Sequence, residues 1–200
     1  MTGPARPHDT DLATHDPAGR ERLVTALDPL GIDYELVACD PTLADTTAFC
    51  AAYGFAPEDS ANTILVIGKG SPPSYAACVV LAPNRLDVNR TVRDRLGRRK
   101  ASFAPAESTR EITGMEIGGV TVFGLPADLP IWIDARVMDR ERVVVGGGSR
   151  SWKVILRPAD LLRIPGAGVV EGLASEPASQ PATESSGAAA PDALEAGPAA

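Results

Sequence analysis

The groups in this sequence that could do chemistry are glycine-rich turns, three lysines and a few carboxylates, because its central part contains no histidine. The two histidines, His8 and His15, lie in an N-terminal stretch rich in Pro, Asp, Thr and Ala. Hydrolases that need a histidine base, and zinc sites built on imidazole, are therefore not expected. The side chains left to assist hydrolysis include hydroxyls, the carboxylate Asp134 and the lysines Lys69, Lys100 and Lys153.

Two glycine clusters, Gly118-Gly119 and Gly146-Gly147-Gly148, could supply main-chain donors to a ligand. Glycine lacks a Cβ and allows positive φ, so its N–H groups can approach a developing oxyanion closely. Such donors, together with a positioned water, could suffice for an ester that is already reactive. Spacing alone favours the other interpretation, in which the clusters are tight turns between strands.

No cofactor or metal site is expected. The three cysteines, Cys39, Cys50 and Cys78, are odd in number and lack CxxC spacing, which is typical of buried thiols rather than of disulfides or zinc sites. The phosphate-binding pattern GxxxxGK[ST] is also missing from the sequence.

Composition predicts one folded domain between two tails. The chain has 200 residues, 44% of them hydrophobic. Residues 1–18 and 174–200 lack core-forming residues, so we expect them to be disordered around a domain at 19–173. Seven of the 26 acidic residues but only one of the 19 basic residues lie in these tails. The domain therefore carries 18 basic against 19 acidic residues, and the net charge of -7 does not describe it.

The sequence contains neither a membrane span nor a secretion signal that we can identify. Its longest apolar runs, 64–67 and 76–82, are far too short to cross a bilayer, and residues 1–19 have no apolar stretch after a basic start. A cytoplasmic location is the expectation.

Hydrophobic periodicity predicts short strands and helices in alternation. This pattern is typical of a single α+β domain with a curved mixed β-sheet or barrel-like core and surrounding helices. The predicted helices are 20–30, 44–53, 87–96, 106–113 and 158–163, and the predicted strands are 34–38, 62–67, 75–81, 100–103, 120–123, 131–133, 142–145 and 152–156.

A run of basic residues could contact RNA phosphates in a largely sequence-independent way. With Asp87 and Asp94 nearby, the run could equally be the solvated face of a helix and turn. The candidate RNA contacts in it are Arg90, Arg93, Arg98, Arg99 and Lys100.

Three segments in a fixed order carry a family likeness: 61–67 (ANTILVI), 114–124 (GMEIGGVTVFG) and 146–150 (GGGSR). Together they resemble the YbaK/prolyl-tRNA-synthetase-associated family of aminoacyl-tRNA editing deacylases. The likeness covers about residues 20–173 and includes 128–134 (DLPIWID). It implies the same α+β fold.

The resemblance also implies a pocket for the acyl group of a mischarged tRNA. Asn62 and Asp134 stand at the positions with catalytic roles, but the family usually carries a lysine at position 62. Asp134 could equally be a strand-end residue that caps the loop after it. Asparagine offers a neutral donor and acceptor and supplies no charge. The substrate-binding residues that the resemblance implies are Thr63, Gly118, Gly119, Thr121, Phe123, Gly124, Gly146, Gly147, Gly148 and Ser149.

The expected function is hydrolysis in trans of the ester of a mischarged tRNA, by a positioned water with backbone oxyanion donors, in support of translation fidelity. Aminoacyl-tRNA is the expected partner, and DNA is not. Because Asn62 replaces the lysine, a catalytically weak or inactive binding or regulatory module is the alternative. A third possibility is a small-molecule or nucleotide-binding domain unrelated to tRNA.

Overall fold

A computed structural model of the chain describes residues 16–176. Most of the two tails expected to be disordered lies outside this range. The first described element, α2 (Pro17–Leu27), starts at a capping bond in which Asp16 accepts from the Gly19 amide. It continues into η1 (Asp28–Leu30), which Gly31 ends at φ 58°. No helix in residues 16–176 is both long and apolar enough to cross a membrane.

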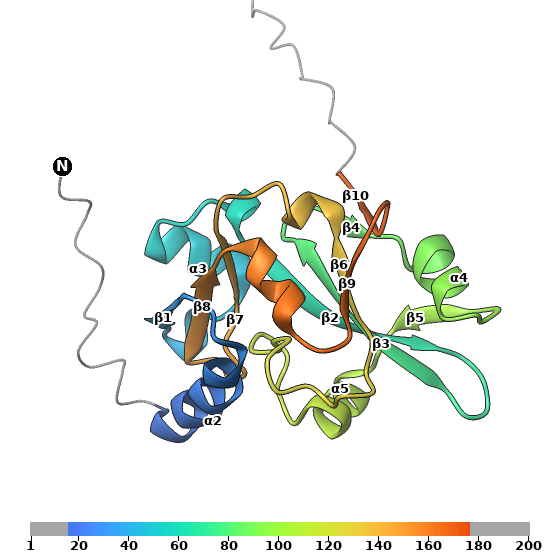
Figure 1. The fold of residues 1–200 in the computed structure, drawn as a ribbon, viewed down its shortest axis with the longest axis horizontal. Coiled ribbons are helices and arrows are strands. Elements are labelled where there is room, and N and C mark those ends of the chain that lie inside the picture. Colours follow the sequence, from blue (N-terminus) through green and yellow to red (C-terminus); the bar gives the residue numbers. More distant parts are fainter. Residues whose placement is uncertain (1–15, 177–200) are drawn as a thin grey trace, which may run out of the picture.

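A five-stranded mixed sheet forms the larger part of the fold, in the order β5-β2-β3-β6-β9. Its centre is the long antiparallel hairpin of β2 (Ala61–Gly68) and β3 (Ser74–Leu81), which crosses the molecule in Figure 1. β5 (Ala101–Phe103) pairs antiparallel with β2. On the other side β6 (Ile131–Asp134) and β9 (Ala167–Val170) add in parallel.

A smaller antiparallel sheet lies beside the start of β2, in the order β1-β8-β7. It consists of β1 (Tyr34–Ala38), β7 (Val143–Gly146) and β8 (Trp152–Leu156). A bridge between Ser60 and Val144 joins the two sheets. This junction is where the candidate site lies.

Short helices and one small ribbon complete the described domain. Besides α2, the longest helices are α3 (Thr46–Tyr53) and α5 (Ala106–Thr113). β4 pairs with β10. The remaining elements are η2 (Pro41–Leu43), η3 (Pro57–Asp59), β4 (Arg85–Leu86), the π-helical turn η4 (Val88–Val92), α4 (Arg93–Arg95), η5 (Ala135–Val137), η6 (Pro158–Arg163) and β10 (Ala174–Ser175).

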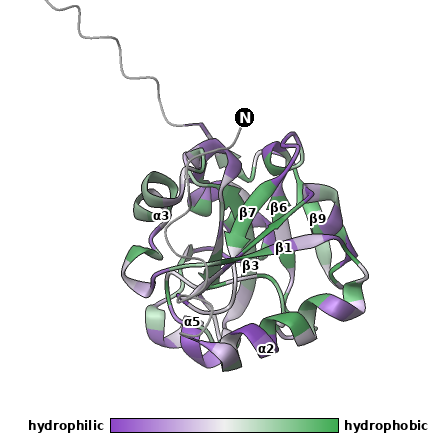
Figure 2. Ribbon diagram, turned by 90° about the vertical axis from the view of Figure 1, so that its left-hand side faces the viewer, coloured by the Kyte–Doolittle hydropathy of each residue, from purple (hydrophilic) through white to green (hydrophobic). Residues whose placement is uncertain are grey.

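The apolar core lies between the two sheets and under the helices. Figure 2 shows hydrophobic central strands, with hydrophilic stretches on α2 and α5. Alternation along β2 divides its side chains between two clusters: Leu65 packs with Leu27, whereas Val66 packs with Val92 and Leu173. Side chains on one face of β2 therefore point toward the smaller sheet.

The structure confirms the α+β class and most of the expected elements. The strand predicted at 120–123 is wrong, because Gly118 (φ 90°) and Gly124 (φ 79°) bound an irregular segment. In it the Thr121 amide faces the Met115 sulfur rather than a neighbouring strand. β9 was not predicted, since its sequence AGVV is short and contains a glycine. The sheets in residues 16–176 do not close into a barrel.

The main chain at Gly147 packs tightly against Trp152 of β8, which gives a first prediction. A Cβ added at Gly147 would lie 2.5 Å from the Trp152 carbonyl oxygen, whereas one added at Gly168 meets nothing within 4 Å. Gly147→Ala should therefore lower the free energy of unfolding by about 2 kcal/mol or more through overpacking. Gly168→Ala, the matched control, should change it by less than about 0.5 kcal/mol. Urea unfolding of both variants measures this, and equal stabilities would contradict the close contact.

Candidate active site

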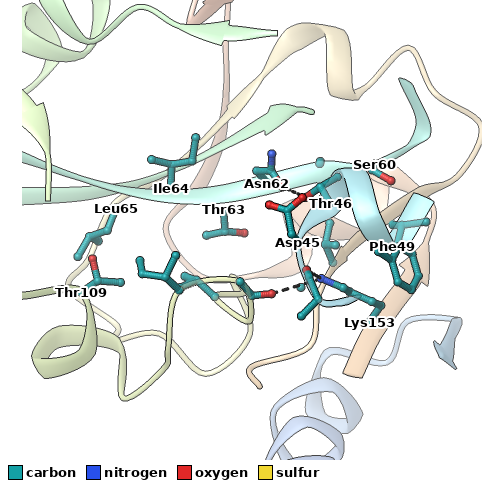
Figure 3. Close-up of a pocket in the computed structure, with 18 of the residues that line it drawn as sticks. Asp45, Thr46, Phe49, Ser60, Asn62, Thr63, Ile64, Leu65, Thr109 and Lys153 are labelled. Atoms are coloured by element: carbon teal, nitrogen blue, oxygen red, sulfur yellow. Dashed lines mark hydrogen bonds between the residues drawn. The ribbon is translucent and has the colours of Figure 1, made fainter. Parts of the chain in front are cut away.

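A pocket of about 390 Å³ opens at the junction of the two sheets. Its walls come from the start of α3, the β2 strand, the turn around Gly118, and the strands β7 and β8 (Figure 3). Apolar side chains form much of the lining, with a few polar groups among them. Its lining residues include Ala44, Asp45, Thr46, Phe49, Asn62, Thr63, Leu65, Phe103, Thr109, Ile117, Gly118, Val120, Val145, Gly146 and Lys153.

The N-terminus of α3 sets one polar pair in this wall. Asp45 caps the helix by accepting from the Thr47 amide, which fixes the next residue, Thr46, over β2. The Thr46 hydroxyl donates to Asn62 Oδ1 at 2.7 Å. With its oxygen engaged, Asn62 donates through Nδ2 to no group within residues 16–176, so these hydrogens are available to a ligand.

Thr63 follows on β2 and presents a buried hydroxyl. The residue is 9% exposed, and its Oγ1 has no hydrogen-bond partner in the described structure. Buried polar atoms are nearly always paired, since leaving one unpaired costs about 1–3 kcal/mol. An orphaned hydroxyl on a pocket wall is a position where a ligand or water can bond.

Lys153 brings an amine into the pocket from β8. The residue is 6% exposed, and its Nζ donates to the main-chain oxygens of Ala44 (2.8 Å) and Gly118 (3.3 Å). The amine also lies 5.3 Å from the centre of the Phe49 ring. Burial lowers the pKa of Lys153 below its ordinary value, because the charged form loses its water.

Two exposed apolar side chains lie at the pocket. Phe103, at the end of β5, and Ile117, before the glycine turn, are each 57% exposed. The other exposed large apolar side chains of the described chain, Leu162 and Val169, do not line it. Phe103 and Ile117 offer a surface on which a flat group could stack.

The structure brings some of the predicted site residues together. Asn62, Thr63, Gly118 and Gly146 line the pocket. Gly119 lies directly behind it, where its carbonyl accepts from the Gly148 amide at 2.8 Å.

Other predicted substrate-binding residues lie elsewhere. Ser149 accepts from the Ser151 amide through its hydroxyl and supports the 146–149 turn. The rest face a second hollow, between α2 and the glycine turns. They are Thr121, Phe123, Gly124, Gly147 and Gly148.

Asp134 does not line either cavity. It is fully buried at the end of β6, where its carboxylate accepts from the Arg136 and Ala174 amides. Through these bonds Asp134 caps η5 and fixes the start of β10. The placement matches the strand-end interpretation of this residue.

The basic run lies around η4, α4 and the start of β5. Arg90 and Arg93 are within salt-bridge distance of Asp87 and Asp94, respectively. Arg98 donates to Ser74 Oγ and to the Pro72 carbonyl, so it holds the β2–β3 loop. The exposed residues that follow are Arg99 and Lys100.

Sequence reasoning did not assign Asp45, Thr46, Phe49 or Phe103 to the site, and it named Lys153 among the available groups without placing it in the pocket. For Lys153 a signal was available, since it is the one charged residue in a strand whose other side chains are apolar (WKVIL). Lysine is rarely buried without a reason. For the other four, no pattern along the chain indicated the pocket.

Comparison with known proteins identifies the family. The model of the aminoacyl-tRNA editing domain matches residues 40–164, more than half of the chain. The matched range includes α3, β2, both glycine turns and Lys153. The chain belongs to the aminoacyl-tRNA editing domain family.

Solved structures share the fold over most of this chain. Hypothetical protein APE2540 superposes with a TM-score of 0.69 at 22% identity, over 77% of this chain and 99% of that one. A candidate trans-editing enzyme for prolyl-tRNA synthetase gives a TM-score of 0.67 at 25% identity, over 77% and 96%. The shared region therefore spans nearly the whole of each neighbour.

Asp134→Asn tests whether this carboxylate is structural. The amide can accept only one of the two amide hydrogens, so we expect a loss of about 2 kcal/mol in the free energy of unfolding. Below the melting temperature, turnover should stay within about threefold of the unchanged protein. Asp128→Asn, at an exposed loop position, is the control and should alter neither quantity. A large loss of turnover with full stability would show a catalytic role instead.

Proposed function

We propose that this protein hydrolyses the ester bond of mischarged aminoacyl-tRNA in trans. The observation that carries the proposal is the pocket within the family-matched region, with Asn62, the orphaned Thr63 hydroxyl and the Gly118 and Gly146 turns on its walls. Its volume of about 390 Å³ lies in the range of small-molecule sites. The structural similarity to a candidate trans-editing enzyme for prolyl-tRNA synthetase supports the same substrate class.

The reaction can run without a histidine because the substrate is an activated ester. Water attacks the carbonyl carbon, and the carbonyl oxygen carries the developing charge. The bond from this carbon to the ribose oxygen then breaks. The proton lost by the water ends on the ribose oxygen, so the products are a free amino acid and tRNA. Positioning and oxyanion stabilisation are the contributions required of the protein.

Asn62 and Thr63 are placed to orient the reactants. Because Thr46 engages Asn62 Oδ1, the Nδ2 group is left to donate to a ribose hydroxyl or to hold the attacking water. Successive side chains of β2 point to opposite faces, so the Thr63 hydroxyl, which has no described partner, can bond a separate group of the substrate or a second water. In this role Asn62 contributes by orienting the water or the ribose hydroxyl, whereas a lysine would contribute a positive charge.

The basic run provides a route for the acceptor stem. β5 leads in three residues from Lys100 to Phe103 at the pocket, a span of about 10 Å. Lys69 lies beside Lys100, since its amide donates to the Lys100 carbonyl at 2.9 Å. Phosphates along these residues would leave the terminal adenosine near Phe103, and binding should weaken with salt.

The direct test is amino acid release from a panel of aminoacyl-tRNAs by the purified protein, including alanyl- and cysteinyl-tRNA for proline. We expect turnover of at least one member, and a loss of turnover in Asn62→Lys, because the added ammonium displaces the Thr46-oriented amide. Leu162→Lys adds the same charge at an exposed position away from the pocket and the basic run, and it serves as control.

Two other outcomes would contradict the proposal. Absence of turnover for every member at micromolar protein would refute a deacylase. Activity that arises only in Asn62→Lys would indicate a binding module built on an editing fold.

A further inference from the structure

Lys153 is an internal amine whose described partners are main-chain carbonyls. It is the second residue of β8, is 6% exposed, and donates to the oxygens of Ala44 and Gly118. No salt bridge within residues 16–176 includes it; the exposed Asp45 is the carboxylate that acts on it electrostatically. An ammonium has three donors, so two bonds leave a third for a ligand.

Keeping this amine buried is costly for the fold. Removing a charged group from water is unfavourable unless it is fully paired, and here desolvation is the largest effect on its pKa. The cation–π contact with the Phe49 ring offsets only part of this desolvation cost. A buried, unpaired cation on a pocket wall is typical of a functional group.

The surroundings of the amine point to an oxygen ligand. Figure 3 shows Lys153 and Thr63 on opposite walls of the same cavity, with Asn62 and Thr46 at its edge. Through Gly118 the amine is also tied to the glycine turn that borders the pocket. A carbonyl oxygen placed between these walls would meet a fixed cationic donor.

We propose that Lys153 donates a hydrogen bond to the carbonyl oxygen of the aminoacyl ester and stabilises the oxyanion formed when water attacks. The proposal rests on the deacylase function proposed above. It means that the positive charge expected on β2 at position 62 is supplied here from β8. In the step itself the lysine keeps its protons: the water supplies both the new C–O bond and the proton that the ribose oxygen takes on leaving.

Substitution of the amine tests the proposal. Lys153→Met keeps the length and apolar stem but removes the donor, so kcat should fall about 100-fold or more with little change in KM, as when an oxyanion donor is removed. Arg163→Met, which removes an exposed cation on η6 that lines neither cavity, should leave both constants unchanged. Binding of a stable amide analogue, aminoacyl-3′-aminoadenosine, is measured alongside by calorimetry and should change little in either variant, because the donor acts mainly on the oxyanion.

The pH dependence separates a donor from a merely structural lysine. Burial has the largest effect on the amine and lowers its pKa. Of four nearby groups, Cys39 just after β1, Cys50 of α3 and Asp45 raise this pKa, whereas Arg150 lowers it further. Above its lowered pKa the amine loses its proton, so the enzymatic rate, corrected for uncatalysed hydrolysis, should decline there. In Lys153→Arg the guanidinium stays charged, and that alkaline decline should disappear.

The outcomes distinguish this inference from the proposed function. If the unchanged protein hydrolyses a mischarged tRNA but Lys153→Met keeps kcat within threefold, the role of Lys153 is refuted and the deacylase stands. If Lys153→Met does not fold, an alkaline limb that is identical in Lys153→Arg and the unchanged protein refutes it. If the unchanged protein neither turns over a substrate nor binds the analogue, both proposals fail.

Discussion

Close contact between the two glycine turns is the constraint on which the site depends. A Cβ at Gly119 would lie 2.5 Å from the Ser149 carbonyl carbon, and one at Gly146 would overlap the Val120 carbonyl oxygen. The main chains can approach this closely only without side chains, and the Gly148 amide then donates to the Gly119 carbonyl. This contact fixes the 118–120 segment against β7 and β8, and so sets the depth of the pocket and the position of the Gly118 oxygen that holds Lys153.

The remaining features of the site follow from its lack of histidine. Without a histidine base in the described chain, rate acceleration depends on how well fixed donors replace the water around a reacting ester. The Asp45 cap positions Thr46, Thr46 orients Asn62, and two main-chain oxygens hold the Lys153 amine. Each of these groups is immobilised by the fold before a substrate arrives. Preorganisation of this kind lowers a barrier without a proton-transferring side chain.

Local sequence signals predicted the elements well but predicted the site only in part. Strands such as 34–38 and 152–156 carry apolar, β-branched runs, and the helix at 106–113 ends at a glycine, so their existence was clear from the sequence. The segment 120–123 has the same composition, yet tertiary contacts of Gly118 and Gly119 keep it irregular. Local strand propensity does not predict such a contact, because Gly119 contacts Ser149, which lies 30 residues away along the chain.

The same limit applies to the site residues. Asn62, Thr63, Gly118 and Gly146 lie close together in three dimensions, whereas Phe123 and Gly147 face the hollow beside α2. Lys153 was recognisable as a lysine among apolar neighbours, but its direction depends on the pairing of β8 with β1 and β7. Side-chain alternation places a residue on a face, and only the assembled sheets show which cavity that face borders.

The most direct measurement of the central claim is a crystal structure with the amide analogue aminoacyl-3′-aminoadenosine bound. The account predicts that the acyl carbonyl oxygen lies within hydrogen-bond distance of Lys153 Nζ, with the acyl group between β2 and the turn at Gly118. An acyl group in the second hollow beside α2, or a carbonyl oxygen directed away from the amine, would contradict it.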